Sequence, residues 1–171
     1  MTKFNVETLR QAVEGWIHNW VSVYNTALEA VPCPFAKQAI VDKKIVYCYC
    51  ETGQHVSQTL IDLASRGFAE GKEVLVIGID PTAISAADLQ ALTSLANETY
   101  LGAAGYIALE DHPADTETIN GEIMNQGQWA LLLVQAKSKL DKASAILDKQ
   151  GYYKNWSNEN LDDVVNWRNK S

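Results

Sequence analysis

The sequence predicts an α/β fold in a single domain spanning residues 1–171, with an open mixed or parallel sheet of about four strands and helices packed on it. Four short apolar runs have the length and the β-branched or aromatic content of strands, and they lie at residues 44–50, 73–79, 106–110 and 129–135. Between most of them stand a dozen or more residues with helical periodicity, enough for parallel crossover connections. If the last strand ran antiparallel, we would expect a two-layer ferredoxin-like α+β sandwich instead.

Residues 1–31 are predicted to form one long N-terminal helix, because apolar side chains recur at intervals of three and four. The stripe consists of Val6, Leu9, Val13, Trp16, Trp20, Val23, Ala27 and Val31. Pro32 and Pro34 prevent the helix from continuing. We therefore expect Trp16 and Trp20 to be mostly buried, and Glu14 and His18 to remain outside the core.

Two later segments are less regular. The polar residues 111–128 are predicted to contain a short helix near residues 116–124, and the direction of the last strand depends on this segment. Residues 152–171 form an aromatic-rich C-terminal extension that includes Tyr152, Tyr153, Trp156 and Trp167. These rings could pack against the Trp16 and Trp20 side of the first helix, or they could contact a protein partner or a second copy of the chain.

Composition and charge narrow the class of protein. The net charge of −7 and the scattered Lys and Arg residues argue against a nucleic-acid ligand. No apolar run approaches the roughly 18 residues that span a bilayer, and the first residues lack a secretory pattern. Three cysteines, an odd number, argue against a disulfide framework. The sequence therefore predicts a cytoplasmic protein without a membrane segment.

Cys33 lies between Pro32 and Pro34, directly after the predicted helix. A short helix starting after Pro34 would put Cys33 near its positive end, where the thiol pKa falls, and Lys37 could add a second positive charge. Cys33 would then be a nucleophile or redox thiol. Alternatively, Cys33 is a small apolar plug beneath the first helix, where burial raises the pKa, or, less simply, a metal ligand.

Further candidates follow the predicted strands, because the carboxyl ends of parallel strands meet at one edge of a sheet. These residues are Cys48, Cys50 and Glu51 after the first strand, Asp80 after the second, and Glu110, Asp111 and His112 after the third. His112 could act as a general base oriented by Asp111 or Glu110, or it could be an ordinary loop residue. Lys37, Glu51 and Asp80 are candidate substrate-binding residues.

Cys48 and Cys50 share one face of the first predicted strand. Zinc sites usually carry CxxC pairs, so a CxC pair with a distant histidine is a weak metal signal. We interpret both cysteines as small buried side chains. Neither a glycine-rich phosphate loop nor a dinucleotide fingerprint occurs, and we predict no cofactor and no metal site.

Two short motifs resemble those of an uncharacterised bacterial family, domain of unknown function 1415. The motifs are Cys33-Pro34-Phe35-Ala36 and the later His112-Pro113, and Trp16 matches the tryptophan-bearing helix that precedes the first motif in that family. The order of elements is similar over most of the chain. Val31-Pro32 before the motif departs from the pattern, and the tail beyond Gly151 is extra. The resemblance implies no known activity, and it singles out Cys33 and His112.

Two functional hypotheses follow from these observations. In the first, the protein is a small enzyme acting on a small metabolite, with Cys33 as nucleophile or redox thiol, His112 as base, and Asp111 or Glu110 orienting the imidazole. In the second, it is a non-catalytic interaction or assembly protein that uses its aromatic C-terminal region. Whether the protein is an enzyme stays open at the level of sequence.

Overall fold

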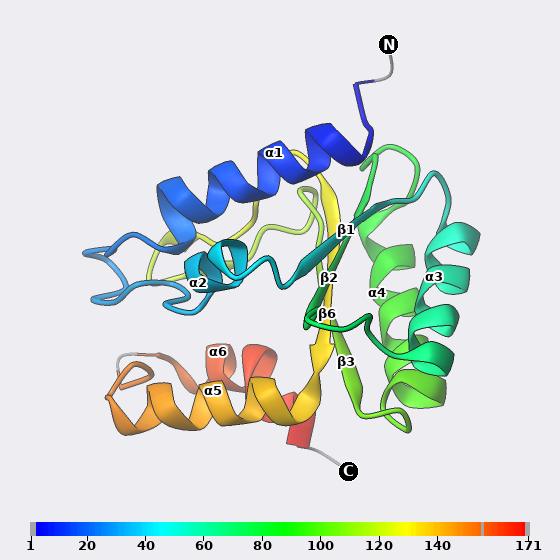
Figure 1. The fold of residues 1–171 in the computed structure, drawn as a ribbon. Helices are drawn as coiled ribbons and strands as arrows, with labels where there is room; N and C mark the ends of the chain where they lie inside the picture. The colour runs from blue at the N-terminus through cyan, green and yellow to red at the C-terminus, as the bar shows by residue number, and fades with distance from the viewer. Residues whose placement is uncertain (1–2, 155, 170–171) are drawn as a thin grey trace.

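The computed structural model of the protein describes residues 3–154 and 156–169 and confirms the predicted α/β class. A four-stranded mixed sheet lies between helices (Figure 1). The helices are α1 (Val6–Trp16), α2 (Ala36–Val41), α3 (Gly53–Arg66), α4 (Ala86–Ala96), α5 (Lys137–Lys149) and α6 (Asn158–Val164). The strands are β1 (Ile45–Tyr49), β2 (Val74–Ile79), β3 (Tyr106–Asp111), β4 (Thr118–Ile119), β5 (Glu122–Ile123) and β6 (Ala130–Ala136).

The main sheet has the strand order β1-β2-β6-β3. β1 and β2 are parallel, whereas β6 is antiparallel to both of its neighbours, β2 and β3. β1, β2 and β3 therefore share one direction, and their carboxyl ends lie at the same edge. β6, the last of these strands along the chain, lies between β2 and β3 in the sheet.

Helices cover both faces of the sheet, so the two-layer ferredoxin-like sandwich is not the fold (Figure 1). α3 and α4 pack on the face that carries Ile77 and Leu132, which we call the α3/α4 face. α1 packs on the face that carries Val76 and Leu131. Figure 1 shows α5 and α6 on the same side as α1, and we call this side the α1/α5 face. In the described residues we find no helix with the length and apolar character of a bilayer-spanning segment.

The N-terminal helix is shorter than the predicted residues 1–31. α1 continues as a π-helical turn over Ile17–Val21 and then ends. Beyond it, the side-chain oxygen of Asn25 accepts hydrogen bonds from the backbone N–H groups of Ala27 (2.9 Å) and Leu28 (3.0 Å). A side-chain acceptor of this kind competes with the helical carbonyls. The resulting turn buries Leu28, while Ala27, on the predicted stripe, is exposed.

The buried face of the first helix carries Leu9, Val13, Ile17 and Val21, at intervals of four residues. A wider π-helical turn keeps such a spacing on one face, because its hydrogen bonds span five residues. Trp16 and Trp20 are only partly buried, and their rings stack with centroids 6.2 Å apart. His18 is exposed, as predicted.

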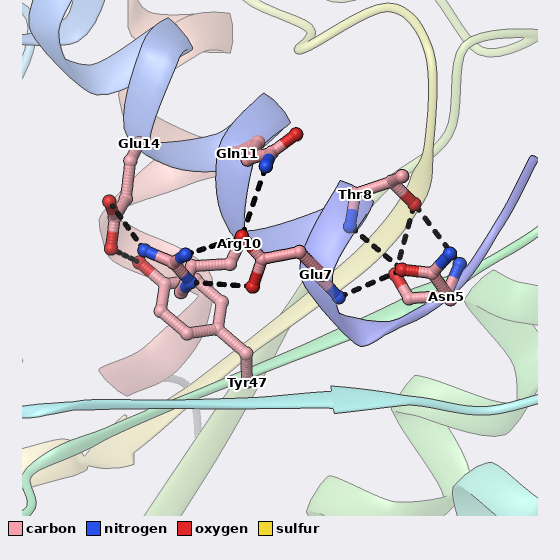
Figure 2. A network of polar contacts seen from close by, with 7 residues as sticks. All are labelled: Asn5, Glu7, Thr8, Arg10, Gln11, Glu14 and Tyr47. Atoms are coloured by element: carbon pink, nitrogen blue, oxygen red, sulfur yellow. Dashed lines mark hydrogen bonds and ion pairs between the residues drawn. The ribbon is translucent and has the colours of Figure 1, made fainter.

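A polar network anchors the start of α1 and joins the helix to β1 (Figure 2). Asn5 caps the helix by accepting hydrogen bonds from the N–H groups of Glu7 and Thr8. Glu14 accepts a hydrogen bond from the Tyr47 hydroxyl at 3.3 Å and lies in an ion pair with Arg10. The partly buried Glu14 is thus an inter-element contact on the α1/α5 face rather than a purely solvated residue.

The prediction of a helix near residues 116–124 is wrong, because β4 and β5 form a small hairpin there. Its turn residues Asn120 and Gly121 both have positive φ, 52° and 84°. Asn-Gly is the residue pair that best tolerates a two-residue hairpin turn of this kind. The local signal was present in the sequence between Ile119 and Glu122, and the polar composition of the segment obscured it.

Candidate functional site

Cys33 lies on the α1/α5 face, in the loop that joins the first helix to α2. Its backbone N–H donates to the carbonyl of Val21 at 2.9 Å. A short helix does begin after Pro34, as predicted, and the thiol accepts hydrogen bonds from the backbone N–H groups of Phe35 and Ala36. Burial nevertheless outweighs these bonds and raises the pKa of the Cys33 thiol. A raised pKa is expected for a packed thiol, whereas a thiolate nucleophile is expected to have a lowered pKa.

His112 is buried at the end of β3, and both of its ring nitrogens bond to the backbone. Nδ1 accepts a hydrogen bond from the Ala114 N–H at 3.0 Å, so Nε2 carries the proton and donates it to the Ile84 carbonyl at 2.9 Å. Ile84 belongs to the core on the α3/α4 face, whereas Cys33 packs in the core on the opposite face. The structure therefore does not bring His112 and Cys33 together as a thiol–imidazole pair.

The two carboxylates next to His112 have other partners. Asp111 accepts hydrogen bonds from the Asn125 side chain (2.7 Å) and the Gln126 N–H (2.9 Å), which ties down the loop after β3. Glu110 lines a polar cleft of about 480 Å³ together with Asp115 and other residues. Burial raises the pKa of both Glu110 and Asp111. Neither carboxylate accepts a hydrogen bond from the ring of His112, whose two partners are backbone groups.

The three predicted substrate-binding residues do not join the same site. Lys37 is exposed on α2, and Glu51 is exposed after β1. Asp80 accepts hydrogen bonds from the Thr82 N–H (2.9 Å) and hydroxyl (2.8 Å), which closes the turn after β2. Burial is the main cause that raises the pKa of Tyr49, and the negative charges of Glu51 and Asp80 add to it. The parallel strands therefore do bring these two carboxylates near one ring.

Cys33 borders a half-open hollow of about 230 Å³ on the α1/α5 face, which we call the Cys33 cavity. The apolar and aromatic part of its wall consists of Pro32, Phe35, Leu109, Ile119, Met124, Leu140, Ala143, Leu147, Tyr152, Tyr153 and Trp156. The polar part consists of Cys33, Glu117, Ser144 and Arg168. Five separate parts of the chain thus converge here: the loop before α2, β3, the hairpin segment, α5 and the C-terminal region.

Tyr152, Tyr153 and Trp156 of the aromatic C-terminal region line this cavity, whereas Trp167 lines a separate hollow beside Tyr106 and Ile107. The Tyr152 hydroxyl donates a hydrogen bond to the carbonyl of Pro32, next to Cys33. Tyr152, Tyr153 and Trp156 contact one another with ring centroids 4.9–5.7 Å apart. Sequence reasoning noticed these aromatic residues but had no signal for their contact with the loop more than a hundred residues earlier.

Arg168 is the buried charged residue of the cavity wall, with a side chain only 2% exposed. Its Nη2 donates to the Ser144 hydroxyl at 2.9 Å, and its Nε donates to the Val165 carbonyl at 3.1 Å. The remaining nitrogen, Nη1, makes no hydrogen bond to the described residues and lies 3.9 Å from a carboxylate oxygen of Asp141. A buried guanidinium nitrogen without a hydrogen bond favours an additional anionic partner. Sequence reasoning missed Arg168.

Cys48 and Cys50 lie elsewhere, on the α3/α4 face at the end of β1. Their sulfur atoms are 3.9 Å apart. Cys50 is fully buried, as predicted, and Cys48 is partly exposed. In the described part of the chain, no group of three or more His, Cys, Asp or Glu side chains is arranged to hold a metal ion.

No protein-family model, no curated protein and no solved structure matches the chain in the comparisons with known proteins. The resemblance of the Cys33-Pro34-Phe35-Ala36 and His112-Pro113 motifs to a bacterial family therefore stays a prediction.

Proposed function

We propose that the protein is a cytoplasmic binding protein for a small, mainly apolar molecule that carries one anionic group, held in the Cys33 cavity. The observation that supports this proposal most is the combination of an apolar, aromatic wall with one buried guanidinium, Arg168. Ligand sites are typically concave and apolar, with a few polar groups that fix the orientation of the ligand.

The size of the cavity limits the ligand. Its volume of about 230 Å³ lies below the ~300–1,000 Å³ of typical ligand pockets. A single ring or a short branched chain suits this space better than a nucleotide or a long lipid. Burying the apolar body of such a ligand against Leu109, Leu140 and Trp156 would contribute about 25 cal/mol per Å² of apolar surface removed from water.

The charge of the ligand follows from the two charged residues of the wall. Arg168 is buried, and its Nη1 atom lies 3.9 Å from Asp141 without a hydrogen bond to the described residues, whereas Glu117 is exposed. A carboxylate that reaches Arg168 would pair with a guanidinium in a low-dielectric environment, where such a pair is stronger than at the surface. The cavity therefore favours an acid over a neutral or cationic ligand.

Binding explains the geometry better than either earlier hypothesis. A cysteine enzyme needs a base near Cys33, and the ring nitrogens of His112 are both engaged by backbone groups. An interaction protein needs accessible aromatic residues, yet Tyr152 and Trp156 are partly buried, and the Tyr152 hydroxyl donates to the carbonyl of Pro32. In the binding proposal, Cys33 is a small side chain of the wall and the aromatic residues form its cover.

Titration of the full chain with benzoate, followed by two-dimensional amide NMR, tests the proposal. We expect saturable shifts around the Cys33 cavity with a dissociation constant of about 1 mM or below, and at least about tenfold weaker binding of the neutral benzamide. Ala143→Leu, which fills the cavity, should abolish the shifts. Ala91→Leu, on the exposed side of α4, is the matched control and should bind as the natural protein does. Equal binding of benzoate by both variants would contradict the proposal.

A further inference from the structure

The two thiols at the end of β1 form a close pair that the binding proposal does not use. The Sγ atoms of Cys48 and Cys50 are 3.9 Å apart, close to van der Waals contact. Cys48 is partly exposed, while Cys50 is fully buried beneath α3. β1 is an edge strand, since it pairs only with β2 in the main sheet. Cys48 is therefore the more accessible thiol of the pair, and Cys50 is placed to react with it.

The surroundings of the pair favour a thiolate on Cys48. The Thr59 hydroxyl of α3 lies 3.6 Å from the Cys50 sulfur, and His55 lies one turn earlier on the same helix. The pKa of the Cys48 thiol is lowered to about 6, mainly by hydrogen bonding from Cys50; burial opposes this shift, and Thr59 and the charge of His55 contribute to it. The pKa of Cys50 is raised in turn, first by its bond to Cys48 and then by burial.

We propose that Cys48 and Cys50 form a redox-active dithiol that reacts with disulfides, with Cys48 as the attacking sulfur and Cys50 as the resolving sulfur. The Cys48 thiolate attacks one sulfur of a disulfide R–S–S–R, forms a mixed disulfide and releases one thiolate RS⁻. Cys50 then attacks the Cys48 sulfur, forms the Cys48–Cys50 disulfide and releases the second RS⁻. The protons lost by Cys48 and Cys50 end on the two RSH products, so the protein loses two electrons and the disulfide gains them.

Closing this bond requires the end of β1 to move, because parallel side chains two residues apart on a strand hold their Cβ atoms farther apart than the ~3.5–4.5 Å of a disulfide. Residues two apart in a strand have Cα atoms about 6.6–6.8 Å apart, at the upper end of the ~4.4–6.8 Å range of disulfides. Cys50 lies just beyond the last residue of β1, where the strand has ended. A disulfide at the limit of the allowed geometry is easily reduced, which suits a cycling or sensing role better than a structural one. Transient disulfides are also the kind found in reducing compartments.

Cys33 provides an internal comparison within the same chain. Burial raises the pKa of its thiol, and it packs on the opposite face of the sheet from Cys48 and Cys50. The same reagent should therefore distinguish a paired, activated thiol from a packed one without any change to the protein.

Treatment of the full chain with glutathione disulfide, acid quenching and peptide mass mapping test the proposal. Cys48 and Cys50 lie in one tryptic peptide, residues 45–66, whereas Cys33 lies in another. We expect this peptide to lose two hydrogen masses, to regain them with a small dithiol, and to react at least about tenfold faster than Cys33. Cys50→Ser should trap one glutathionyl group on Cys48, and Cys48→Ser should leave Cys50 unmodified, while Cys33→Ser should change nothing.

Three results would overturn the proposal. The first is reaction of Cys33 before the peptide 45–66. The second is a stable double glutathionyl adduct on Cys48 and Cys50 with no internal disulfide. The third is the absence of any reaction until urea unfolds the chain. Because the measurement on the natural protein stands alone, failure of a serine variant to fold would leave the test intact.

Discussion

Replacing Gly78 by alanine tests how α1 docks on the sheet. Gly78 lies in β2 on the face that α1 covers, and a Cβ atom there would be 2.4 Å from Cδ1 and 2.8 Å from Cδ2 of Leu9. Non-bonded carbons prefer about 3.5–4.0 Å. Leu9 is fully buried, with neighbours such as Val76 and Trp129 around it. The extra methyl group therefore requires α1, or the packing around Leu9, to shift.

The magnitude follows from two opposing effects. Overpacking a closed core costs about 1–3 kcal/mol, while alanine gains about 0.5–1 kcal/mol over glycine in backbone entropy. Gly78→Ala should thus lower the free energy of unfolding by about 1–2 kcal/mol. Leu9→Ala alone should lower it by about 2–5 kcal/mol. In the double variant the new methyl occupies space that the leucine leaves, so the combined loss should be at least about 1 kcal/mol smaller than the sum.

Urea unfolding of the four proteins, followed by circular dichroism, measures this cycle. With a denaturant slope of about 2 kcal/mol per M, the midpoint of Gly78→Ala should fall by about 0.5–1 M. Gly15→Ala is the control, because no atom lies within 4 Å of a Cβ added there on α1. The same chemical change should then stabilise the protein by about 0.5–1 kcal/mol. Additive losses from Gly78→Ala and Leu9→Ala would refute the docking argument.

Three further outcomes are expected. Asn97→Ala should lower the free energy of unfolding, measured in urea, by about 2–4 kcal/mol. The Asn97 side chain accepts a hydrogen bond from the N–H (2.9 Å) and donates one to the carbonyl (3.0 Å) of the buried Ala108, and Asn97→Asp should lose only the donated bond. The pH midpoint for alkylation of Cys33 should lie above the ordinary thiol pKa of about 8.5, because burial raises the pKa of this thiol. His112→Ala should leave that midpoint unchanged, and a midpoint below about 7.5 would restore the nucleophile hypothesis. The free energy of unfolding of Glu110→Gln should increase relative to that of the natural protein as pH rises from about 4, because burial raises the pKa of Glu110 and the folded state resists its ionisation. A difference in unfolding free energy that stays constant from about pH 3 to 7 would contradict this.

The sequence was most informative about the strands of the main sheet. All four runs predicted from apolar composition, such as 73–79 and 129–135, are strands with nearly the predicted bounds. Continuous apolar runs of that length report burial on both faces, which is a local property. Strand order is not local. The insertion of β6 between β2 and β3 depends on which hydrogen-bonding edges meet after collapse, and no spacing in the sequence encodes it.

Two local errors have local causes. The apolar repeat of the first helix continues past Val21, yet Asn25 offers its side-chain oxygen to the backbone and turns the chain. The polar segment before β6 looked helical, although Asn120-Gly121 is a hairpin signal. In both places one or two residues with a strong backbone preference outweigh a weak periodic pattern.

The separation of Cys33 from His112 has a different cause. His112 follows Ala108 by four residues, so alternation places both on one face of β3, and Ala108 belongs to the core under α4. The sequence contains this alternation, but it does not say which face Cys33 will join. Cys33 went to the other face, where Tyr152 and Trp156 cover it. Burial beneath this cover raises the pKa of the Cys33 thiol. The same packing of the aromatic C-terminal region thus disfavours a thiolate at Cys33 and forms the apolar wall on which the proposed ligand site depends.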